Sequence, residues 1–266
     1  MAHHFVKDGE LAEAGRLRIM LQSFYARNEP MILRFLDRLV RVRFLNNRGR
    51  PILKVLSRLL GFLPTGEVVS TERALNFIDA ISSLDEVDIA VGPCRCQESL
   101  GHKKGTYIKD LVVLYGAEAY KRASSEYKDI SPEEARVLLK QLQEEGMIPT
   151  FYACMRSKGW VFVICNCDSE ICFPFRAHKV AGGVLHLGPD IVAYDRESCI
   201  GCDTCVERCL FGANTIVEGK SQVDLDKCYG CGLCVATCNG QARSMVVREG
   251  YRRCYYPLEL VGRVIA

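Results

Sequence analysis

The apolar positions at the start of the chain predict helices. They recur every three or four residues, which places them on one face of a helix. The first run consists of Leu11, Ala14, Leu17, Leu21 and Phe24. Pro30 begins a second run of the same kind. We therefore expect two helices and predict that residues 1–64 form a helical region.

Helix and strand patterns alternate over residues 65–190. Thr71 is placed to cap a helix, and residues 87–91 alternate apolar and polar side chains as in a strand. Ser131 begins a capping box that starts another helix. Residues 160–164 form an apolar, β-branched run typical of a buried strand. This part of the chain is therefore predicted to be a small mixed α/β domain.

The last quarter of the chain contains an internal repeat of four cysteines. The first copy runs from Cys199 to Cys209 and the second from Cys228 to Cys238, so each cysteine recurs 29 positions later. Both copies have the spacing C-x2-C-x2-C-x3-C, which in bacterial proteins holds two [4Fe–4S] clusters. Three thiolates of one copy can surround one cluster, whereas the fourth begins a helix that points to the other cluster.

This spacing predicts one ligand set for each cluster. The first set is Cys199, Cys202, Cys205 and Cys238. The second set is Cys228, Cys231, Cys234 and Cys209. Two zinc sites are the alternative interpretation, but zinc sites usually separate their C-x-x-C pairs by more than about ten residues. The doubled, tightly spaced pattern therefore favours iron–sulfur clusters.

Residues 190–250 resemble the bacterial-type dicluster ferredoxin domain. The resemblance implies a pseudo-twofold βαβ fold and the transfer of single electrons. Leu210 and Asn239 stand where that family usually has Pro after the fourth cysteine. We expect an α+β protein in four parts: a helical basic region at 1–64, a Cys-rich α/β domain at 65–190, the dicluster ferredoxin domain at 191–250 and a C-terminal tail at 251–266.

Composition adds the expected cellular setting. The chain has 15 cysteines in 266 residues, and its first residues lack the apolar run of a signal peptide. Clustered cysteines in a cytoplasmic protein bind metal more often than they form disulfides. The formal charge of +3 is too small to indicate nucleic-acid binding, and we expect no transmembrane segment. The sequence has no nucleotide-binding fingerprint.

Six further cysteines precede the repeat, and five of them follow two predicted strands. If these strands are neighbours in one sheet, their ends bring the thiols together. We predict that the five hold a third metal centre, iron–sulfur or zinc, because thiolates are soft ligands. These residues are Cys94, Cys96, Cys165, Cys167 and Cys172.

Alternatives to this third centre stay open. His102 or Cys154 could join the ligands. The five thiols could also be reduced and buried without metal, since free Cys packs as a small apolar residue. Cys254 is interpreted as a plain thiol.

Residues 65–245 resemble a group of proteins of anaerobes that are described as 4Fe–4S dicluster-domain proteins. The resemblance rests on Pro93-Cys-Arg-Cys96 and on Ile164-Cys-Asn-Cys167. It implies an oxygen-poor setting. Asp168 and Phe173 stand where that pattern often has further cysteines.

Basic residues are concentrated between Arg27 and Arg58, a stretch that contains nine basic and two acidic residues. Arg34, Arg38 and Arg41 share one face of the predicted helix. The face could simply be solvated. It could instead dock an acidic surface of a redox partner protein, or contact an anionic membrane peripherally.

Together these patterns predict an iron–sulfur electron-transfer protein with two [4Fe–4S] clusters, as a subunit or partner of an anaerobic redox complex. Two alternatives remain. An upstream centre with an open iron would favour a catalytic oxidoreductase, and salt-sensitive nucleic-acid binding would favour a redox-sensing regulator. The repeat fits all three functions and requires only the first.

Overall fold

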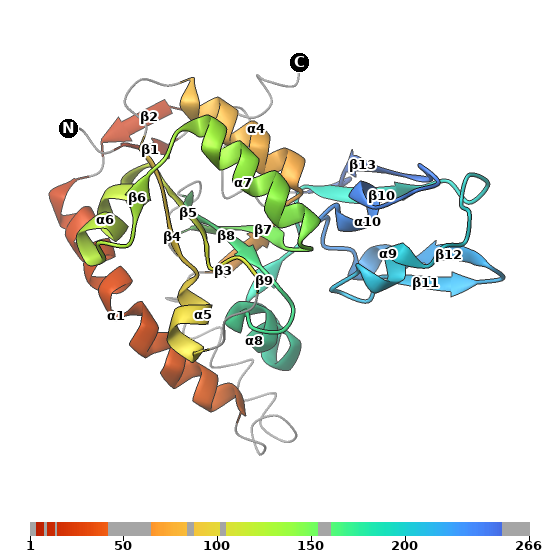
Figure 1. Cartoon of the computed structure of the whole chain (residues 1–266), viewed down its shortest axis with the longest axis horizontal. Coiled ribbons are helices and arrows are strands. Elements are labelled where there is room, and N and C mark those ends of the chain that lie inside the picture. Colours follow the sequence, from red (N-terminus) through yellow and green to blue (C-terminus); the bar gives the residue numbers. More distant parts are fainter. Residues whose placement is uncertain are drawn as a thin grey trace.

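The computed structural model describes residues 4–7, 10–13, 15–41, 65–83, 88–101, 105–153 and 161–251. A larger body carries a smaller C-terminal domain at one end of its long axis (Figure 1). Both helices and strands build the chain, as the α+β prediction requires. Among the described residues, no helix is both long and apolar enough to cross a membrane.

A mixed sheet of seven strands forms the centre of the body. Neighbouring strands are antiparallel except for the last pair, which is parallel. Their order is β6 (Lys128–Asp129), β4 (Ile89–Pro93), β5 (Ile108–Val113), β8 (Val161–Cys167), β7 (Ile148–Ala153), β3 (Thr65–Val68) and β9 (Leu185–His186). Because β5 is antiparallel to both β4 and β8, these two strands run in the same direction.

Helices enclose the sheet. Helices α4 (Thr71–Ser82) and α7 (Pro132–Glu144) lie side by side against one face (Figure 1). On the opposite side, the long helix α1 (Arg16–Arg41) packs along α5 (Arg95–Leu100), α6 (Tyr115–Ala123) and α8 (Phe173–Ala181).

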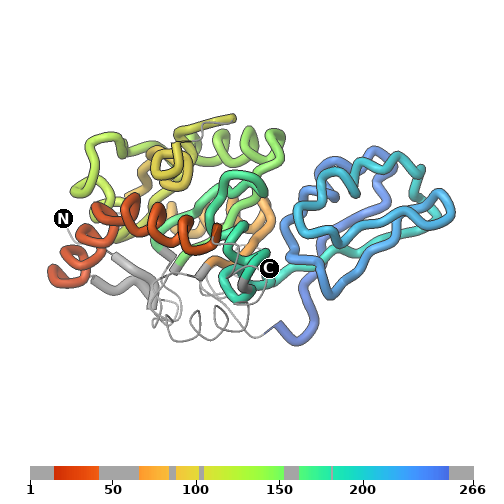
Figure 2. Tube along the Cα trace, turned by 90° about the horizontal axis from the view of Figure 1, so that it is seen from below, coloured from red at the N-terminus to blue at the C-terminus, as the bar shows by residue number. Residues whose placement is uncertain are grey.

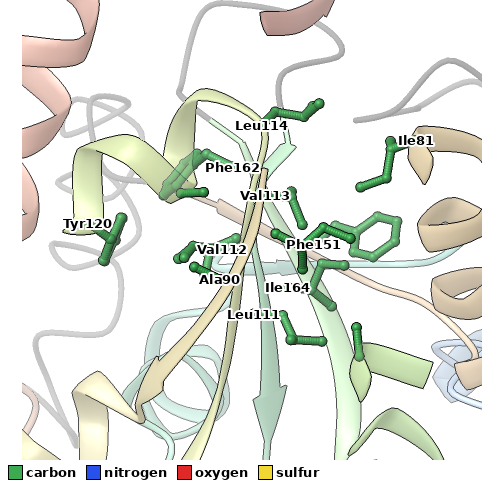
Figure 3. Close-up of a cluster of buried hydrophobic side chains, with 14 of the residues drawn as sticks. Ile81, Ala90, Leu111, Val112, Val113, Leu114, Tyr120, Phe151, Phe162 and Ile164 are labelled. Atoms are coloured by element: carbon green, nitrogen blue, oxygen red, sulfur yellow. The ribbon is translucent and has the colours of Figure 1, made fainter. Parts of the chain in front are cut away.

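Apolar side chains of the central strands fill the space between the layers. Leu111, Val112, Phe151 and Ile164 are completely buried (Figure 3). Burying one such side chain contributes about 1.5–3 kcal/mol. The core therefore fixes the strand ends from which the upstream cysteines project.

Capping residues define where the helices of the body begin. The capping box predicted at Ser131 is confirmed. The Ser131 hydroxyl accepts from the Glu134 N–H, and the Glu134 carboxylate accepts from the Ser131 N–H. The predicted cap of α4 is wrong by one residue. Ser70, not Thr71, accepts from the Arg73 N–H at 3.2 Å, because Ser70 has the extended backbone of an N-cap residue.

Helix α1 differs from its prediction in two ways. It is one continuous helix with Pro30 inside it, rather than two helices. Its predicted core positions Leu17 and Phe24 are 66% and 69% exposed, whereas Ile19 and Ala26 are buried. Apolar residues occupy two stripes of this helix, and the one with the small Ala26 allows close packing against the body.

The segment ahead of α1 is not entirely helical. Strands β1 (His4–Lys7) and β2 (Glu10–Glu13) form an antiparallel pair, so Leu11 lies in a strand. The prediction of Leu11 as a helix position is therefore wrong.

The C-terminal domain lies at one end of the body (Figure 2) and consists of two halves with the same order of elements. The first half is β10 (Asp190–Tyr194), α9 (Thr204–Glu207) and β11 (Asn214–Val217). The second half is β12 (Lys220–Val223), α10 (Leu233–Ala236) and β13 (Arg243–Val247). Strand β10 pairs with β13 and β11 with β12, so every strand pairs with one of the other half.

Candidate metal centres

The two cysteine repeats surround two small cavities in the C-terminal domain. Each cavity has about 20 Å³ and is lined by three cysteines of one repeat and the last cysteine of the other. The first set lines one cavity: Cys199, Cys202, Cys205 and Cys238. The second set lines the other: Cys228, Cys231, Cys234 and Cys209. The fold thus places around each cavity the four cysteines that the spacing grouped.

Two glycines let the cysteine loops turn tightly. Gly201 and Gly230 occupy equivalent positions in the two halves, with φ of 71° and 79°. A Cβ on Gly201 would lie 2.4 Å from the carbonyl oxygen of Gly219, and one on Gly230 would lie 2.1 Å from that of Asp190. Any other residue would therefore push the loop out of place.

Backbone N–H groups are directed at the sulfur atoms. Ala213 donates to Cys209 Sγ at 3.2 Å, and Ala242 donates to Cys238 Sγ at 3.3 Å. Such N–H···S bonds are one of the ways in which proteins adjust the potential of iron–sulfur clusters. Four soft donors around a glycine-bounded space, with N–H groups on sulfur, fit a [4Fe–4S] cluster.

A cubane binds each thiolate through a different iron, so its four sulfur ligands need not converge on one point. In the described parts of the chain, no three His, Cys, Asp or Glu side chains are grouped around a position for a single ion.

The first and second sets lie in different environments. Cys202 of the first set is exposed. The hydroxyl of Thr204 holds the pKa of Cys202 below its ordinary value, and the N–H of Ser221 does the same for Cys199. In the second set, burial raises the pKa of Cys231 to about 12. The first set, through Cys202, is therefore the more exposed of the two.

The upstream cysteines line a larger cavity, of about 140 Å³, in the body. All five predicted residues contribute: Cys94, Cys96, Cys165, Cys167 and Cys172. Helix α1 forms the opposite wall through Tyr25, Glu29 and Leu33. The structure therefore gathers these cysteines from two strand ends and the beginnings of two helices.

The arrangement of strands at this cavity corrects one prediction. Cys94 follows β4 and Cys167 ends β8, but these strands are not neighbours, since β5 lies between them. Their parallel direction still places both ends at the same edge of the sheet. Two strand spacings amount to roughly 10 Å, and α5 and α8 bring the remaining thiols into that gap.

Cys96 lies at the centre of the upstream thiols. The N–H of Phe173 donates to Cys96 Sγ at 3.4 Å. Hydrogen bonding by the thiols of Cys172 and Cys94 holds the pKa of Cys96 well below its ordinary value. Burial raises the pKa of Cys172, which also contacts Cys167. Four of the five thiols thus form one chain of contacts.

Ionisable carboxyl groups beside this cavity were not anticipated from the sequence. Tyr120 Oη donates to Glu29 Oε2 at 2.9 Å, and the N–H of Arg95 donates to Asp110 Oδ2 at 3.1 Å. Burial raises the pKa of Glu29 to about 8 and that of Asp110 to about 7. Asp110 had a recognisable signal, a carboxylate within the apolar run 108–113, but Glu29 had none.

Three further residues named in the sequence analysis lie outside the described residues. They are His102, Cys154 and Cys254.

The second cysteine set adjoins the body through aromatic side chains. Phe211 stacks on Tyr229 with centroids 4.1 Å apart, and Phe175 of α8 lies 4.9 Å from Phe211. Cys231 and Cys172 pack against the same apolar cluster. A continuous apolar contact therefore joins the second set to the upstream cavity.

Polar contacts fasten the same junction. Arg73 of α4 binds Asp190 at the start of β10, with Nη2–Oδ1 at 2.6 Å and Nε–Oδ2 at 2.9 Å. His178 Nε2 lies 2.6 Å from Tyr229 Oη, and His178 Nδ1 accepts from the Leu185 N–H. The C-terminal domain is thus held to the body on both sides of the aromatic contact.

Comparison with known proteins identifies the C-terminal domain only. Residues 191–239 match the family model described as a 4Fe-4S dicluster domain. No curated protein matches the chain. The chain therefore contains a C-terminal ferredoxin-type domain of the kind that binds [4Fe–4S] clusters.

Proposed function

We propose that this chain is an electron-transfer protein with two [4Fe–4S] clusters. One observation carries the proposal: the part that matches the 4Fe-4S dicluster model has its eight repeated cysteines around two cavities. The first set, Cys199, Cys202, Cys205 and Cys238, is proposed to hold one cluster. The second set, Cys228, Cys231, Cys234 and Cys209, is proposed to hold the other.

Each cluster, when bound, accepts or gives one electron. The chain supplies the thiolates, the N–H···S bonds and the shielding from water. The exposed first set is suited to exchange with an external partner, since Cys202 reaches the surface. The less exposed second set, which adjoins the body through Cys231, is suited to exchange with it. This arrangement makes the C-terminal domain a short conductor from surface to body.

The physiological setting belongs to the same proposal. We place the protein in the cytoplasm of an anaerobe, as a subunit or partner of a redox complex, with peripheral membrane contact as a further option. A body of this size is more than a simple carrier needs. The exposed Arg34, Arg38 and Arg41 are proposed to meet an acidic surface of the partner protein. Arg34 and Arg41 also bind Ser99 O and Asp37 within the chain.

A third centre in the upstream cavity is the second candidate. Its support is the cavity of about 140 Å³ and the contacts among four thiols. Soft thiolates suit an iron–sulfur cluster, and zinc less well given their number. If that centre had an open iron, the protein would be a catalytic oxidoreductase fed by the second set through the apolar contact at Phe211.

The test is the iron and sulfide content of full-length protein purified without oxygen. About eight iron atoms per chain indicate two clusters, and about twelve indicate three. Cys254→Ser is the control, since that residue is predicted to be a plain thiol. Protein that is folded but binds less than about four iron atoms, or binds zinc instead, would contradict the proposal.

A further inference from the structure

Arg243 is buried between the two cysteine sets. It is the first residue of β13 and is only 8% exposed. It stands five residues after Cys238, and the equivalent position 29 residues earlier is Asn214, which is also buried. The two halves of the repeat therefore meet through a cation on one side and an amide on the other.

The immediate partners of Arg243 are uncharged. Arg243 Nη1 donates to Asn214 Oδ1 at 2.9 Å, and Nη2 donates to the hydroxyl of Ser221. The guanidinium also lies over the ring of Tyr194, 5.2 Å from its centroid. Burying a cation among neutral groups is costly unless negative charge is close by. These contacts alone do not compensate the charge.

The cysteine sets are the remaining neighbours. Arg243 itself lines the cavity of the first set. Its partner Ser221 donates its N–H to Cys199 Sγ at 3.5 Å and accepts from Cys205 Sγ at 3.2 Å. Its other partner, Asn214, lines the cavity of the second set. One guanidinium therefore adjoins both cavities, directly at the first set and through Asn214 at the second.

We propose that Arg243 is the buried counter-charge of both clusters and raises both reduction potentials. This inference rests on the proposed two-cluster function. Four thiolates make each bound cluster negative overall, and reduction adds one more electron. A guanidinium keeps its charge at any relevant pH. It therefore stabilises the reduced form more than the oxidised form, because Coulomb attraction is strong in a poorly hydrated interior.

The two clusters should respond unequally. Arg243 lines the first cavity and shares Ser221 with Cys199 and Cys205, whereas it reaches the second cavity only through Asn214. Arg243 binds no substrate and acts only through the clusters. Its effect is therefore measured as a change in their reduction potentials. No bond or proton needs to move in this step, since one electron enters the cluster from an external reductant.

The experiment is a redox titration of the full chain with dithionite and mediator dyes, followed by EPR. In Arg243→Gln, the ratio of reduced to oxidised first cluster at a fixed potential should fall about tenfold, equivalent to about 59 mV. The second cluster should shift in the same direction by less. Arg243→Lys keeps the charge, so the ratio of reduced to oxidised cluster at the same potential should stay within about threefold of that in the parent protein.

Two further variants keep the test sharp. Asn214→Asp leaves the guanidinium in place but sets a carboxylate against it, so both potentials should fall even if Arg243→Gln fails to assemble. Arg196→Gln is the matched control, because Arg196 is an exposed arginine of the same domain, paired with Glu218. Removing its charge should change neither reduction potential appreciably, since exposed charges are screened by salt and water.

Iron content separates this inference from the function on which it rests. If the parent protein binds no clusters, the two-cluster function fails. If Arg243→Gln or Asn214→Asp retains full iron and both potentials move no more than in Arg196→Gln, the role of Arg243 is overturned.

Discussion

The eight cysteines of the C-terminal domain belong to a sequence repeated after 29 residues, whereas the five of the upstream cavity come from segments spread between Cys94 and Cys172. In the first region each set depends mainly on one loop and one residue of the other half. In the second, the position of every thiol depends on the order of strands in a seven-stranded sheet. Local spacing therefore predicts the first arrangement, and only tertiary structure reveals the second.

The two regions also differ in the charges that they bury. The C-terminal domain buries the cation Arg243 between its cysteine sets. The upstream cavity has the carboxyl groups of Glu29 and Asp110 beside its thiols, together with Arg95. Positive charge favours reduced, more negative clusters, whereas carboxyl groups that ionise oppose them. A centre of the kind proposed for the upstream cavity would therefore experience a different field from the clusters beside Arg243.

The largest effect is expected from removing a cysteine that one repeat contributes to the other repeat's set. Cys238→Ser should remove about four iron atoms per chain, one cluster's share. The EPR signal that disappears should be the one lost in Cys202→Ala and not the one lost in Cys231→Ala. If Cys238→Ser and Cys231→Ala lose the same signal, each repeat holds its own cluster and the crossed arrangement is wrong.

A second change tests whether the upstream region holds metal at all. Cys96→Ala with Cys172→Ala removes the centre of the thiol contacts. Iron should fall from about twelve to about eight atoms per chain, with both ferredoxin signals retained. An unchanged iron content, with the protein folded, would identify these cysteines as plain buried thiols.

The buried carboxyl group of Glu29 is expected to make the stability of the fold depend on pH. Its pKa is raised to about 8 from an ordinary 4.5, so the folded chain keeps a proton that the unfolded chain has released. This group therefore destabilises the fold progressively as pH rises from about 4.5 to about 8.

Glu29→Gln removes that titration. Its melting temperature relative to the parent protein should rise between pH 5 and pH 8 and then level off. Glu144→Gln, at an exposed position of α7, is the control. A difference between Glu29→Gln and the parent that does not vary with pH would show that Glu29 is ionised in the folded protein.

The smallest effect concerns docking. Reversing Arg34, Arg38 and Arg41 to Glu should slow association with the redox partner by roughly tenfold at low salt. The difference should shrink at physiological ionic strength, where screening acts beyond about 8–10 Å. Equal rates for both proteins at low salt would mean that this face is only solvated.

Sequence reasoning reached as far as local interactions determine structure. The capping box at Ser131 and the grouping of the repeated cysteines depend on residues close in sequence or related by a repeat. The position of β5 between β4 and β8 is a long-range choice that no local pattern contains. The buried face of α1 was misjudged at Leu17 and Phe24, because two apolar stripes compete in that helix.

Arg243 was missed for a different reason. A single charged residue in a predicted strand is usually at the surface, so it attracts no attention by itself. Superposing the two halves at their 29-residue offset would have paired Arg243 with Asn214. Two polar residues at the same inward position are the signal that could have found it.

The pairing of β10 with β13 and of β11 with β12 means that neither half of the C-terminal domain is complete by itself. A single half contributes three cysteines to one set, lacks the fourth, and leaves its strands without partners. A peptide of half the length would complete both sets only as a symmetric dimer in which each copy gave one cysteine to the other. Such a dimer would have the same residue at both equivalent positions, whereas the single chain combines Arg243 in one half with Asn214 in the other.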